Sequence, residues 1–447
     1  MEPVDWSGGH PRSPRFGDVY FQEDGLAESR AVFLAGCGLP QAWAGRRRFT
    51  LAELGFGTGL NVLALLQLWA QARPSPEARL SIFSVEGFPM PRADAARALA
   101  RWPELAELAA PLLAAWPDGR RGRRRIAWPG LGAMLDLAVE EALPAVQGWD
   151  GGADAWFLDG FAPAANPAMW APGLLGAAAA RTAPGGRLAS FTVAGAVRRA
   201  LADAGLQVDK RPGHGRKRER LEARAPGAPP RAGSAPRVAV VGGGVAAAAL
   251  MRAFQAEGLA PLRIDAAAPS PASGNAAALV APRLDAGLGL AARLHAEAFA
   301  RATALYAQLP GAVIARGALQ LARRPQDEDR FARLAAWGGF APGRLHPLAP
   351  DLAATRLAEA AAPAALQIDD ALVVEPAAVL RAWLGEAPLL PGQVAAIARE
   401  HGETVLRDPE GSVLHRCDAA VLACGAGLAA LLPELDLRPT RGQASEA

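Results

Sequence analysis

The sequence predicts an α/β protein of two consecutive domains. Three observations lead to this fold class: two glycine-rich turns, a segment rich in proline and glycine between them, and an alternation of strand-like and helical runs. Two glycine-rich turns, in residues 53–59 and 241–247, each follow a strand-like apolar run and open a helical one. Such turns let backbone amides approach a nucleotide cofactor. Between them, residues 224–236 are dominated by proline and glycine and show no hydrophobic period. We therefore predict a first domain over 1–223, a linker over 224–236 and a second domain over 237–447.

In the first domain, short apolar runs alternate with helical ones, which is typical of a doubly wound, largely parallel sheet. The predicted strands are 49–54, 80–86, 155–159 and 187–192, and the predicted helices are 61–71, 91–101, 131–143 and 194–204. The second domain begins with a βαβ unit, for which the predicted elements are strand 237–241, helix 246–257 and strand 262–265. A longer mixed region follows.

The formal net charge is only +3, but arginines cluster at 46–48, 120–125 and 216–218. This basic density suits contacts with a phosphate backbone, and a solvated, arginine-biased surface explains it equally well. Three cysteines without metal-ligand spacing favour a reducing, cytoplasmic setting. The N-terminus does not read as a signal peptide, and the apolar stretches are too short to span a membrane.

The first glycine-rich turn has the spacing Glu-x-Gly-x-Gly-x-Gly, which suits a methionine-plus-nucleoside ligand better than a pyrophosphate. The next predicted strand ends in a glutamate, where a carboxylate can accept both ribose hydroxyls. A purely structural turn is the alternative. The predicted S-adenosylmethionine contacts are Glu53, Gly55, Gly57, Gly59, Asn61 and Glu86.

Asp159 stands at the carboxyl end of a later predicted strand, where ligands bind in open α/β sheets. Primary amines are mostly protonated at neutral pH, so a nitrogen nucleophile needs a proton acceptor. We therefore predict that Asp159 holds an amine substrate beside the methyl donor and accepts its proton. Alternatively, Asp159 caps a helix or pairs with an arginine.

The second turn, with Gly242, Gly243 and Gly244, matches a dinucleotide-binding pattern with alanine at the third small position. Asp265 ends the following strand, where a carboxylate binds an adenosine ribose. These residues by themselves do not separate NAD from FAD.

Several segments carry a more specific resemblance: 16–21, 53–61, 156–170 and 213–219 in the first domain, and 272–275, 316–321, 423–427 and 441–443 in the second. With them the chain closely resembles the family of tRNA 5-methylaminomethyl-2-thiouridine biosynthesis bifunctional proteins. The second half also resembles amine-oxidising flavoproteins of the D-amino-acid-oxidase type.

This resemblance implies a Rossmann-like S-adenosylmethionine methyltransferase domain followed by a D-amino-acid-oxidase-like FAD domain. The flavin domain would oxidise a carboxymethylaminomethyl group on a wobble uridine, and hydrolysis would release glyoxylate and leave an aminomethyl group. The methyltransferase domain would then methylate that amine. The implied cofactors are S-adenosylmethionine and FAD, and the implied partner is the tRNA anticodon loop, with no metal and no membrane. The implied flavin contacts are Ser273, Gly274, Asn275 and Gly425, and the implied tRNA contacts are Arg198, Arg199, Arg216, Lys217 and Arg218.

Some positions depart from the family pattern. Ala165 replaces an expected lysine, His214 an expected phenylalanine and Cys37 an expected asparagine. In the family, the tripeptide at 441–443 begins a further stretch of substrate domain, whereas this sequence stops at Ala447. We therefore expect an incomplete flavin domain with weak or absent oxidase activity.

Two other functions remain open from the residues. In one, the protein is a methyltransferase whose C-terminal half is a non-catalytic tRNA-binding or stabilising module. In the other, the fused enzyme acts on small-molecule amines and the arginine clusters have no nucleic-acid role.

Overall fold

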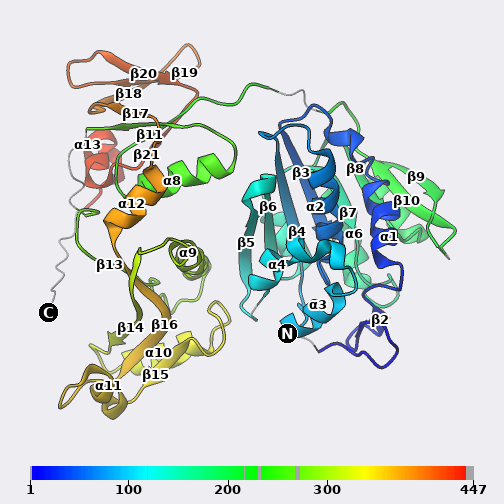
Figure 1. Cartoon of the computed structure of the whole chain (residues 1–447), viewed down its shortest axis with the longest axis horizontal. Helices are drawn as coiled ribbons and strands as arrows, with labels where there is room; N and C mark the ends of the chain where they lie inside the picture. Colours follow the sequence, from blue (N-terminus) through cyan, green and yellow to red (C-terminus); the bar gives the residue numbers. More distant parts are fainter. Residues whose placement is uncertain (1–2, 118, 216, 230–232, 267–271, 439–447) are drawn as a thin grey trace. The chain divides into compact units, whose positions relative to one another are not determined.

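The computed structural model describes residues 3–117, 119–215, 217–229, 233–266 and 272–438. These residues form two compact units (Figure 1). The first unit takes in the described residues up to 229 together with 338–342, and the second unit takes in the rest.

An eight-stranded sheet forms the centre of the first unit, in the order β5-β6-β4-β3-β7-β8-β10-β9. Strands β6, β4, β3, β7 and β8 run parallel. At one side β5 pairs antiparallel with β6, and at the other β10 pairs antiparallel with both β8 and β9. The strands are β3 (Arg48–Leu54), β4 (Arg79–Val85), β5 (Gly122–Trp128), β6 (Ala133–Val139), β7 (Ala153–Leu158), β8 (Thr182–Ser190), β9 (Gln207–Pro212) and β10 (Glu219–Arg224). Near the N-terminus, β1 (Arg12–Ser13) and β2 (Asp18–Val19) form a small ribbon of their own.

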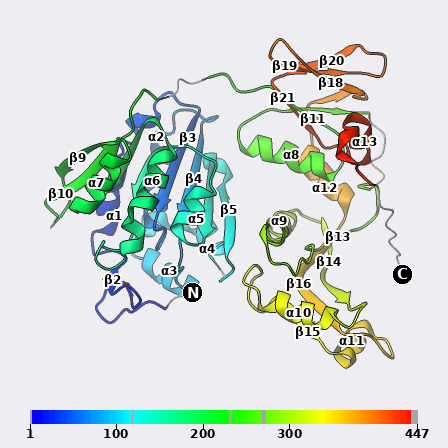
Figure 2. The same cartoon turned by 180° about the vertical axis from the view of Figure 1, so that it is seen from behind.

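Helices cover both faces of this sheet, because alternate residues of its central strands point to opposite sides. On β7, Ala155 and Phe157 join one apolar cluster, and Trp156 and Leu158 join the other. The first cluster includes residues of α2 and α4, and the second includes residues of α5, α6 and α7 (Figures 1 and 2). The helices are α1 (Gly25–Glu28), α2 (Leu60–Ala72), α3 (Arg92–Leu99), α4 (Ala106–Ala114), α5 (Ala142–Gln147), α6 (Pro172–Ala180) and α7 (Gly195–Asp203).

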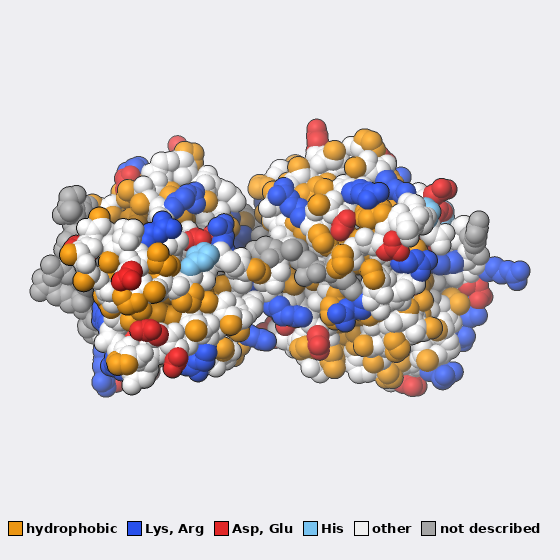
Figure 3. Space-filling model, turned by 90° about the horizontal axis from the view of Figure 1, so that it is seen from below, with side chains coloured by type: hydrophobic (Ala, Val, Ile, Leu, Met, Phe, Trp, Pro, Cys, Tyr) orange, Lys and Arg blue, Asp and Glu red, His pale blue; other side chains and the backbone are white. Residues whose placement is uncertain are grey.

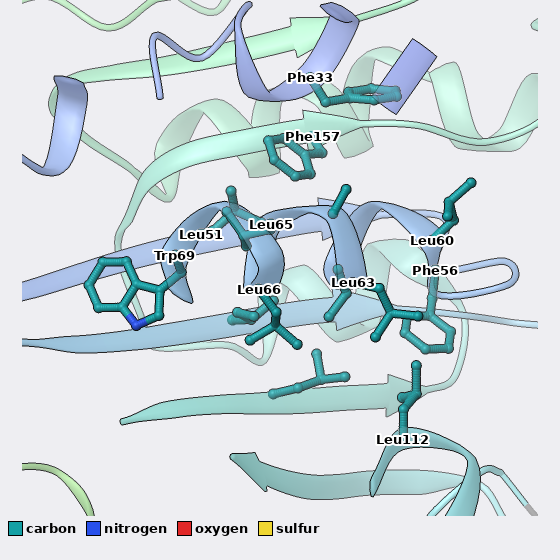
Figure 4. Close-up of a cluster of buried hydrophobic side chains, with 14 of the residues drawn as sticks. Phe33, Leu51, Phe56, Leu60, Leu63, Leu65, Leu66, Trp69, Leu112 and Phe157 are labelled. Atoms are coloured by element: carbon teal, nitrogen blue, oxygen red, sulfur yellow. The ribbon is translucent and has the colours of Figure 1, made fainter. Parts of the chain in front are cut away.

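Helix α2 is the most deeply buried of these elements, which follows from its composition. Its residues Leu63, Leu65 and Leu66 are fully buried, and Trp69 closes the far end of the same cluster (Figure 4). A helix that is apolar on nearly every side belongs in a core. The glycine-rich turn that starts α2 is therefore held by a rigid helix and a central strand.

The helix predicted at 131–143 is wrong, because that segment forms strand β6 and the first residues of α5. Ala133, Leu135 and Leu137 are buried at alternate positions, which is the period of a strand. Between them, Asp136 pairs with Arg125 of β5 at 2.6 Å. Leucine and alanine favour a helix locally, but pairing with β4 and β5 decides the conformation. The other predicted elements each overlap an observed element of the same kind.

The start of the predicted linker is attached to the first unit. Strand β10 extends to Arg224, the backbone N–H of Ala225 donates to the carbonyl of Gly186, and that of Gly185 donates to the carbonyl of Pro226. The proline and glycine residues at this position therefore follow a strand that is already paired.

The second unit contains a parallel sheet in the order β17-β12-β11-β21. Its strands are β11 (Val238–Val241), β12 (Leu262–Asp265), β17 (Leu389–Pro391) and β21 (Ala419–Leu422), and α8 (Val245–Ala256) connects the first two. An antiparallel sheet is made of β13 (Ala278–Val280), β14 (Val313–Leu321), β15 (Leu345–Leu348) and β16 (Ala365–Val374). A three-stranded sheet is made of β18 (Ala396–Glu400), β19 (Glu403–Arg407) and β20 (Val413–Cys417). The remaining helices are α9 (Leu290–Tyr306), α10 (Asp327–Ala336), α11 (Pro350–Leu357), α12 (Pro376–Leu384) and α13 (Leu428–Leu431).

Candidate functional site

A cavity of about 660 Å³ lies in the first unit, at the carboxyl ends of β3, β4 and β7. Its volume is in the range of small-molecule and cofactor sites. Parallel strands end at the same edge of the sheet, so residues far apart in the sequence meet here. Of the predicted residues, the cavity is lined by Gly55, Gly57, Asn61, Glu86, Asp159 and Lys217.

The glycine-rich turn after β3 needs glycine for two separate reasons. Gly55, Gly57 and Gly59 have φ angles of +78°, +54° and +79°, a region that residues with a Cβ rarely adopt. A Cβ on Gly55 would also lie 2.9 Å from the carbonyl oxygen of Asp159. The turn thus packs directly against the end of β7 and brings backbone amides to the cavity wall.

Glu86 follows β4 and is held against this turn. One carboxylate oxygen accepts the backbone N–H of Gly57 at 2.9 Å, and the other accepts that of Phe88 at 2.8 Å. Each carboxylate oxygen can accept more than one hydrogen bond. The position therefore fits a carboxylate that receives ribose hydroxyls of a nucleoside bound over the turn.

Asp159 is the cavity end of a chain of hydrogen bonds that begins at the buried Ser29. The Ser29 hydroxyl donates to Oδ1 of Asn61 at 2.6 Å, and Nδ2 of Asn61 donates to Oδ2 of Asp159 at 2.8 Å. The backbone N–H of Gly160 donates to Oδ1 of Asp159 at 2.8 Å. Burial raises the pKa of Asp159 to about 6, and these hydrogen bonds limit the rise. A carboxylate with a pKa just below the working pH is suited to accept a proton.

Glu53 does not line the cavity and lies behind the turn instead. It is fully buried, and its Oε2 accepts the Ser84 hydroxyl at 2.5 Å. Its Oε1 has no hydrogen-bond partner among the described residues. Burial raises the pKa of Glu53 to about 8, so this side chain is mostly protonated at neutral pH. Gly59 also lies outside the cavity lining.

Aromatic rings that sequence reasoning did not assign to the site form another part of its wall. The ring of Phe161 lies 4.9 Å from that of Phe16 and 5.1 Å from that of Tyr20, centroid to centroid. Phe88 lies 5.7 Å from Phe16. Planar rings of this kind can stack on a base. Their signal in the sequence is that Phe16 and Tyr20 fall in the segment 16–21, and Phe161 in the segment 156–170, that carry the family resemblance.

The predicted tRNA contacts separate into different environments. Arg198 and Arg199 on α7 and Arg218 beyond β9 are exposed, and Arg216 lies outside the described residues. Lys217 instead lines the cavity, where its Nζ donates to Oε1 of Glu28 at 2.7 Å. On the face shown in Figure 3, basic side chains are interspersed with acidic and apolar ones.

Two of the arginine clusters have structural contacts. Arg46 pairs with Asp154 at 2.7 Å, and Arg125 on β5 pairs with Asp136. Arg123 lies 5.6 Å from the ring centroid of Phe83 and donates to the carbonyl of Gly148. These side chains connect neighbouring elements of the first unit, so their clustering alone does not define a nucleic-acid surface.

The second unit places its predicted cofactor residues at the carboxyl edge of the parallel sheet. A Cβ on Gly242 would collide with the carbonyl of Ala423 beyond β21, and a Cβ on Gly243 would collide with the carboxylate of Asp265 on β12. Helix α8 starts just after Gly244, and its positive N-terminal end suits a phosphate group. This cradle fits a dinucleotide whose ribose is bound by Asp265.

The remaining flavin predictions lie around the same edge. The Ser273 hydroxyl accepts the backbone N–H of Val245 at 3.1 Å, so Ser273 reaches the first residue of α8. Gly425 follows β21 with a φ of +57° and is exposed. Gly274 and Asn275 are exposed, and Nδ2 of Asn275 donates to the carbonyl of Ala272, which stabilises their own turn.

Two other kinds of feature are absent from the part of the chain that the structure describes. Among the described residues, no group of three or more histidine, cysteine, aspartate or glutamate side chains could hold a metal ion. In that same part of the chain, no helix has the length and apolar character needed to cross a membrane.

Comparison with known proteins assigns both halves. Residues 103–226 match a family model described as S-adenosyl-L-methionine-dependent methyltransferase, and residues 237–447 match one described as FAD dependent oxidoreductase. The two cofactors predicted from the sequence are therefore confirmed.

Relatives match the chain as a whole. The tRNA 5-methylaminomethyl-2-thiouridine biosynthesis bifunctional protein MnmC of Caulobacter sp. (strain K31) is 56% identical, over 99% of this chain and 74% of the relative. The protein of the same name from Caulobacter vibrioides is 52% identical, again over 99% and 74%. A crystal structure of MNMC2 from Aquifex aeolicus is 23% identical, with a TM-score of 0.40 over 52% of this chain and 73% of that one.

Proposed function

The chain belongs to the family of tRNA 5-methylaminomethyl-2-thiouridine biosynthesis bifunctional proteins, and we propose that it modifies the wobble uridine of tRNA in two consecutive steps. In the first step, the FAD-dependent half removes the carboxymethyl group from 5-carboxymethylaminomethyl-(2-thio)uridine. In the second, the methyltransferase half converts the 5-aminomethyl group into a 5-methylaminomethyl group. We also propose a cytoplasmic location, in keeping with a tRNA substrate.

The observation that carries the second step is the hydrogen-bonded chain from Ser29 through Asn61 to Asp159 at the cavity wall. S-adenosylmethionine supplies the methyl group when bound. The turn at Gly55 and Gly57 and the carboxylate of Glu86 hold its nucleoside, and Asp159 faces the amine. An ammonium group cannot attack the methyl carbon until it loses a proton. Asp159 takes that proton on a carboxylate oxygen, while Asn61 and Ser29 keep the carboxylate in place.

For the first step, we propose that Gly242, Gly243 and the N-terminus of α8 hold the pyrophosphate and that Asp265 holds the adenosine ribose. When bound, FAD would supply the oxidising chemistry by taking a hydride from the carbon next to the nitrogen, and loss of the N–H proton would leave a carbon–nitrogen double bond. Water then cleaves the oxidised bond, which releases glyoxylate and leaves the primary amine that the methyltransferase uses.

We propose that the exposed residues Arg198, Arg199 and Arg218 contact phosphates of the anticodon loop. Their binding contribution should weaken as salt concentration rises, because phosphate contacts release counterions.

The test uses labelled S-adenosylmethionine with tRNA that carries either aminomethyl- or carboxymethylaminomethyl-uridine, and a flavin spectrum of the same preparation. Methylation of both tRNAs supports both steps. Methylation of the aminomethyl tRNA alone removes the oxidase step from the proposal. Equal methylation of free small amines, insensitive to salt, would contradict a tRNA substrate.

A further inference from the structure

Glu28 stands at the cavity in a position that the steps above do not use. It is the last residue of α1 and lines the cavity together with Asp159 and Lys217. Its side chain is only 22% exposed, and its Oε1 accepts Nζ of Lys217 at 2.7 Å. Lys217 itself lies 4.3 Å from the ring centroid of Phe191, another cavity residue.

The segment that carries Glu28 is fixed at a second point. Nε2 of His214 lies 2.9 Å from Oδ2 of Asp24, the residue before α1. His214 and Lys217 both belong to the connection between β9 and β10. Two polar contacts therefore join this connection to α1, and they hold the Glu28 carboxylate at the cavity wall.

Glu28 and Asp159 are close enough to influence each other. Burial is the largest cause that raises the pKa of Asp159, the charge of Glu28 raises it further, and the charge of Lys217 lowers it. A cation bound between Glu28 and Asp159 would be attracted by both carboxylates.

Resting on the proposed methyl transfer, we propose that Glu28 and Asp159 form a two-acceptor site for the substrate nitrogen, and that this site limits the enzyme to one methyl group. A neutral primary amine has two N–H groups and one lone pair. One N–H is donated to the Glu28 carboxylate and the other to the unprotonated oxygen of Asp159, so the lone pair is left for the methyl carbon. Nitrogen forms its bond to that carbon as the carbon–sulfur bond breaks, and the proton first removed from the ammonium resides on Asp159.

After one transfer, the geometry becomes unfavourable for another. A neutral secondary amine has only one N–H, which can be donated to only one of the two carboxyl groups. When its lone pair points at a second methyl donor, the methyl group from the first transfer therefore lies against the other one, Glu28 or Asp159. The carboxyl group beside that methyl group would then lose both its hydrogen bond from the substrate and its solvent. Glu28 would keep its contact with Lys217, and Asp159 would keep its contacts with Asn61 and Gly160. Loss of one hydrogen bond to a charged group slows the step by roughly tenfold to a hundredfold.

The test is the product distribution of Glu28→Ala, measured by mass spectrometry of nucleosides from aminomethyl tRNA. We expect dimethylaminomethyl-uridine to rise at least about tenfold over the wild-type fraction, because alanine leaves room for a methyl group.

Three further variants serve as controls. Glu28→Gln should remain monomethylating, since its amide oxygen still accepts a hydrogen bond. Glu28→Ala also removes the carboxylate partner of Lys217. The double variant Glu28→Ala/Lys217→Ala lacks this lysine charge and should give the same product distribution as Glu28→Ala. Glu23→Ala, at an exposed residue before α1, is the matched control and should resemble the wild type.

A second measurement needs no catalysis. Without S-adenosylmethionine these amines bind as ammonium ions, and a secondary ammonium has two N–H groups for the two carboxylates whereas a tertiary ammonium has one. The wild type should therefore bind methylaminomethyl tRNA more tightly than dimethylaminomethyl tRNA, and the ratio of the two affinities should approach one in Glu28→Ala. Strict monomethylation by an active Glu28→Ala protein, or an unchanged affinity ratio if that protein is inactive, would overturn the inference. Absence of methylation by the wild type would instead overturn the proposed function.

Discussion

Asp159 and Glu53 show how the same type of side chain takes different states at two depths in one site. They lie at the ends of neighbouring parallel strands, Asp159 half-buried at the cavity wall and Glu53 fully buried behind it. Removal from solvent raises the pKa of Asp159 to about 6 and that of Glu53 to about 8. Asp159 has three groups around it that lower the pKa, Gly160, Asn61 and Lys217. At neutral pH, Asp159 is therefore mostly a carboxylate that can accept a proton, and Glu53 is mostly a neutral acid that supports the turn.

The protonation of Asp159 predicts the pH dependence of methyl transfer. Since the carboxylate must be ionised to accept a proton, kcat/KM for aminomethyl tRNA should fall as the pH drops through about 6. The pH profile of the wild type checks this. The limb near pH 6 should be missing from Asp159→Asn, and its persistence there would assign it to another group.

Glu53 predicts a pH-dependent stability. Its folded pKa of about 8 is above the ordinary value of 4.5, so its stabilising contribution is fully present below pH 4.5 and is lost as the pH rises through about 8. Glu53→Gln stays neutral throughout, and we expect it to gain about 2–4 kcal/mol on the wild type between pH 5 and pH 8. Thermal unfolding of the two proteins at both pH values measures the difference. If the difference in free energy of unfolding between the two proteins is the same at pH 5 and pH 8, Glu53 is ionised in the folded protein.

The residues that follow strand ends could be predicted from the sequence, and those that depend on side-chain packing could not. Asn61, Glu86 and Asp159 were identified because parallel strands deliver their carboxyl ends to one edge. Glu28 and Ser29 come from the N-terminal segment, whose position over this edge depends on tertiary contacts such as the Lys217 ion pair. No spacing in the sequence encodes that contact.

At the scale of elements, the glycine-rich turn and the central strands account for the position of the methyl-transfer site. The segment of strand β6 was wrongly predicted as a helix, because Leu135 and Leu137 locally favour that conformation. They form a strand because β4 and β5 pair with this segment on either side, and the two leucines are buried at alternate positions. Strand β5 was missed for a related reason. Its arginines suggest a solvated loop, although Arg125 is paired across the sheet. Edge strands carry charges of this kind, so their sequences do not look apolar.

The turn predicts different costs for two similar substitutions. In Gly55→Ala the Cβ would lie 2.9 Å from backbone atoms of Asp159, which cannot move without displacing β7. In Gly57→Ala the nearest contact is the Tyr20 ring at 3.3 Å, which can shift. Both residues have positive φ, which costs about 1–2 kcal/mol for alanine, so Gly55→Ala should lose more stability and more S-adenosylmethionine affinity. Calorimetric titration and thermal unfolding compare them, and equal losses would contradict this packing.

At the scale of the whole molecule, two cofactor sites in two compact units imply activities that can be removed one at a time. Gly242→Ala should abolish flavin binding, because its Cβ collides with the backbone carbonyl of Ala423, and leave methylation of aminomethyl tRNA unchanged. Gly55→Ala should do the reverse. The flavin spectrum and the methylation rate of each protein test this, and a joint loss of both properties in either variant would show that the units are not independent.

The most direct test of the central claim is methyl transfer from labelled S-adenosylmethionine to aminomethyl tRNA by the wild type and Asp159→Asn, with cofactor affinity measured in parallel. We expect both proteins to bind S-adenosylmethionine equally well and the variant to transfer methyl groups about 10²–10⁴-fold more slowly, because it lacks the general base. Equal transfer rates with equal cofactor affinity would contradict the role of Asp159 as the proton acceptor.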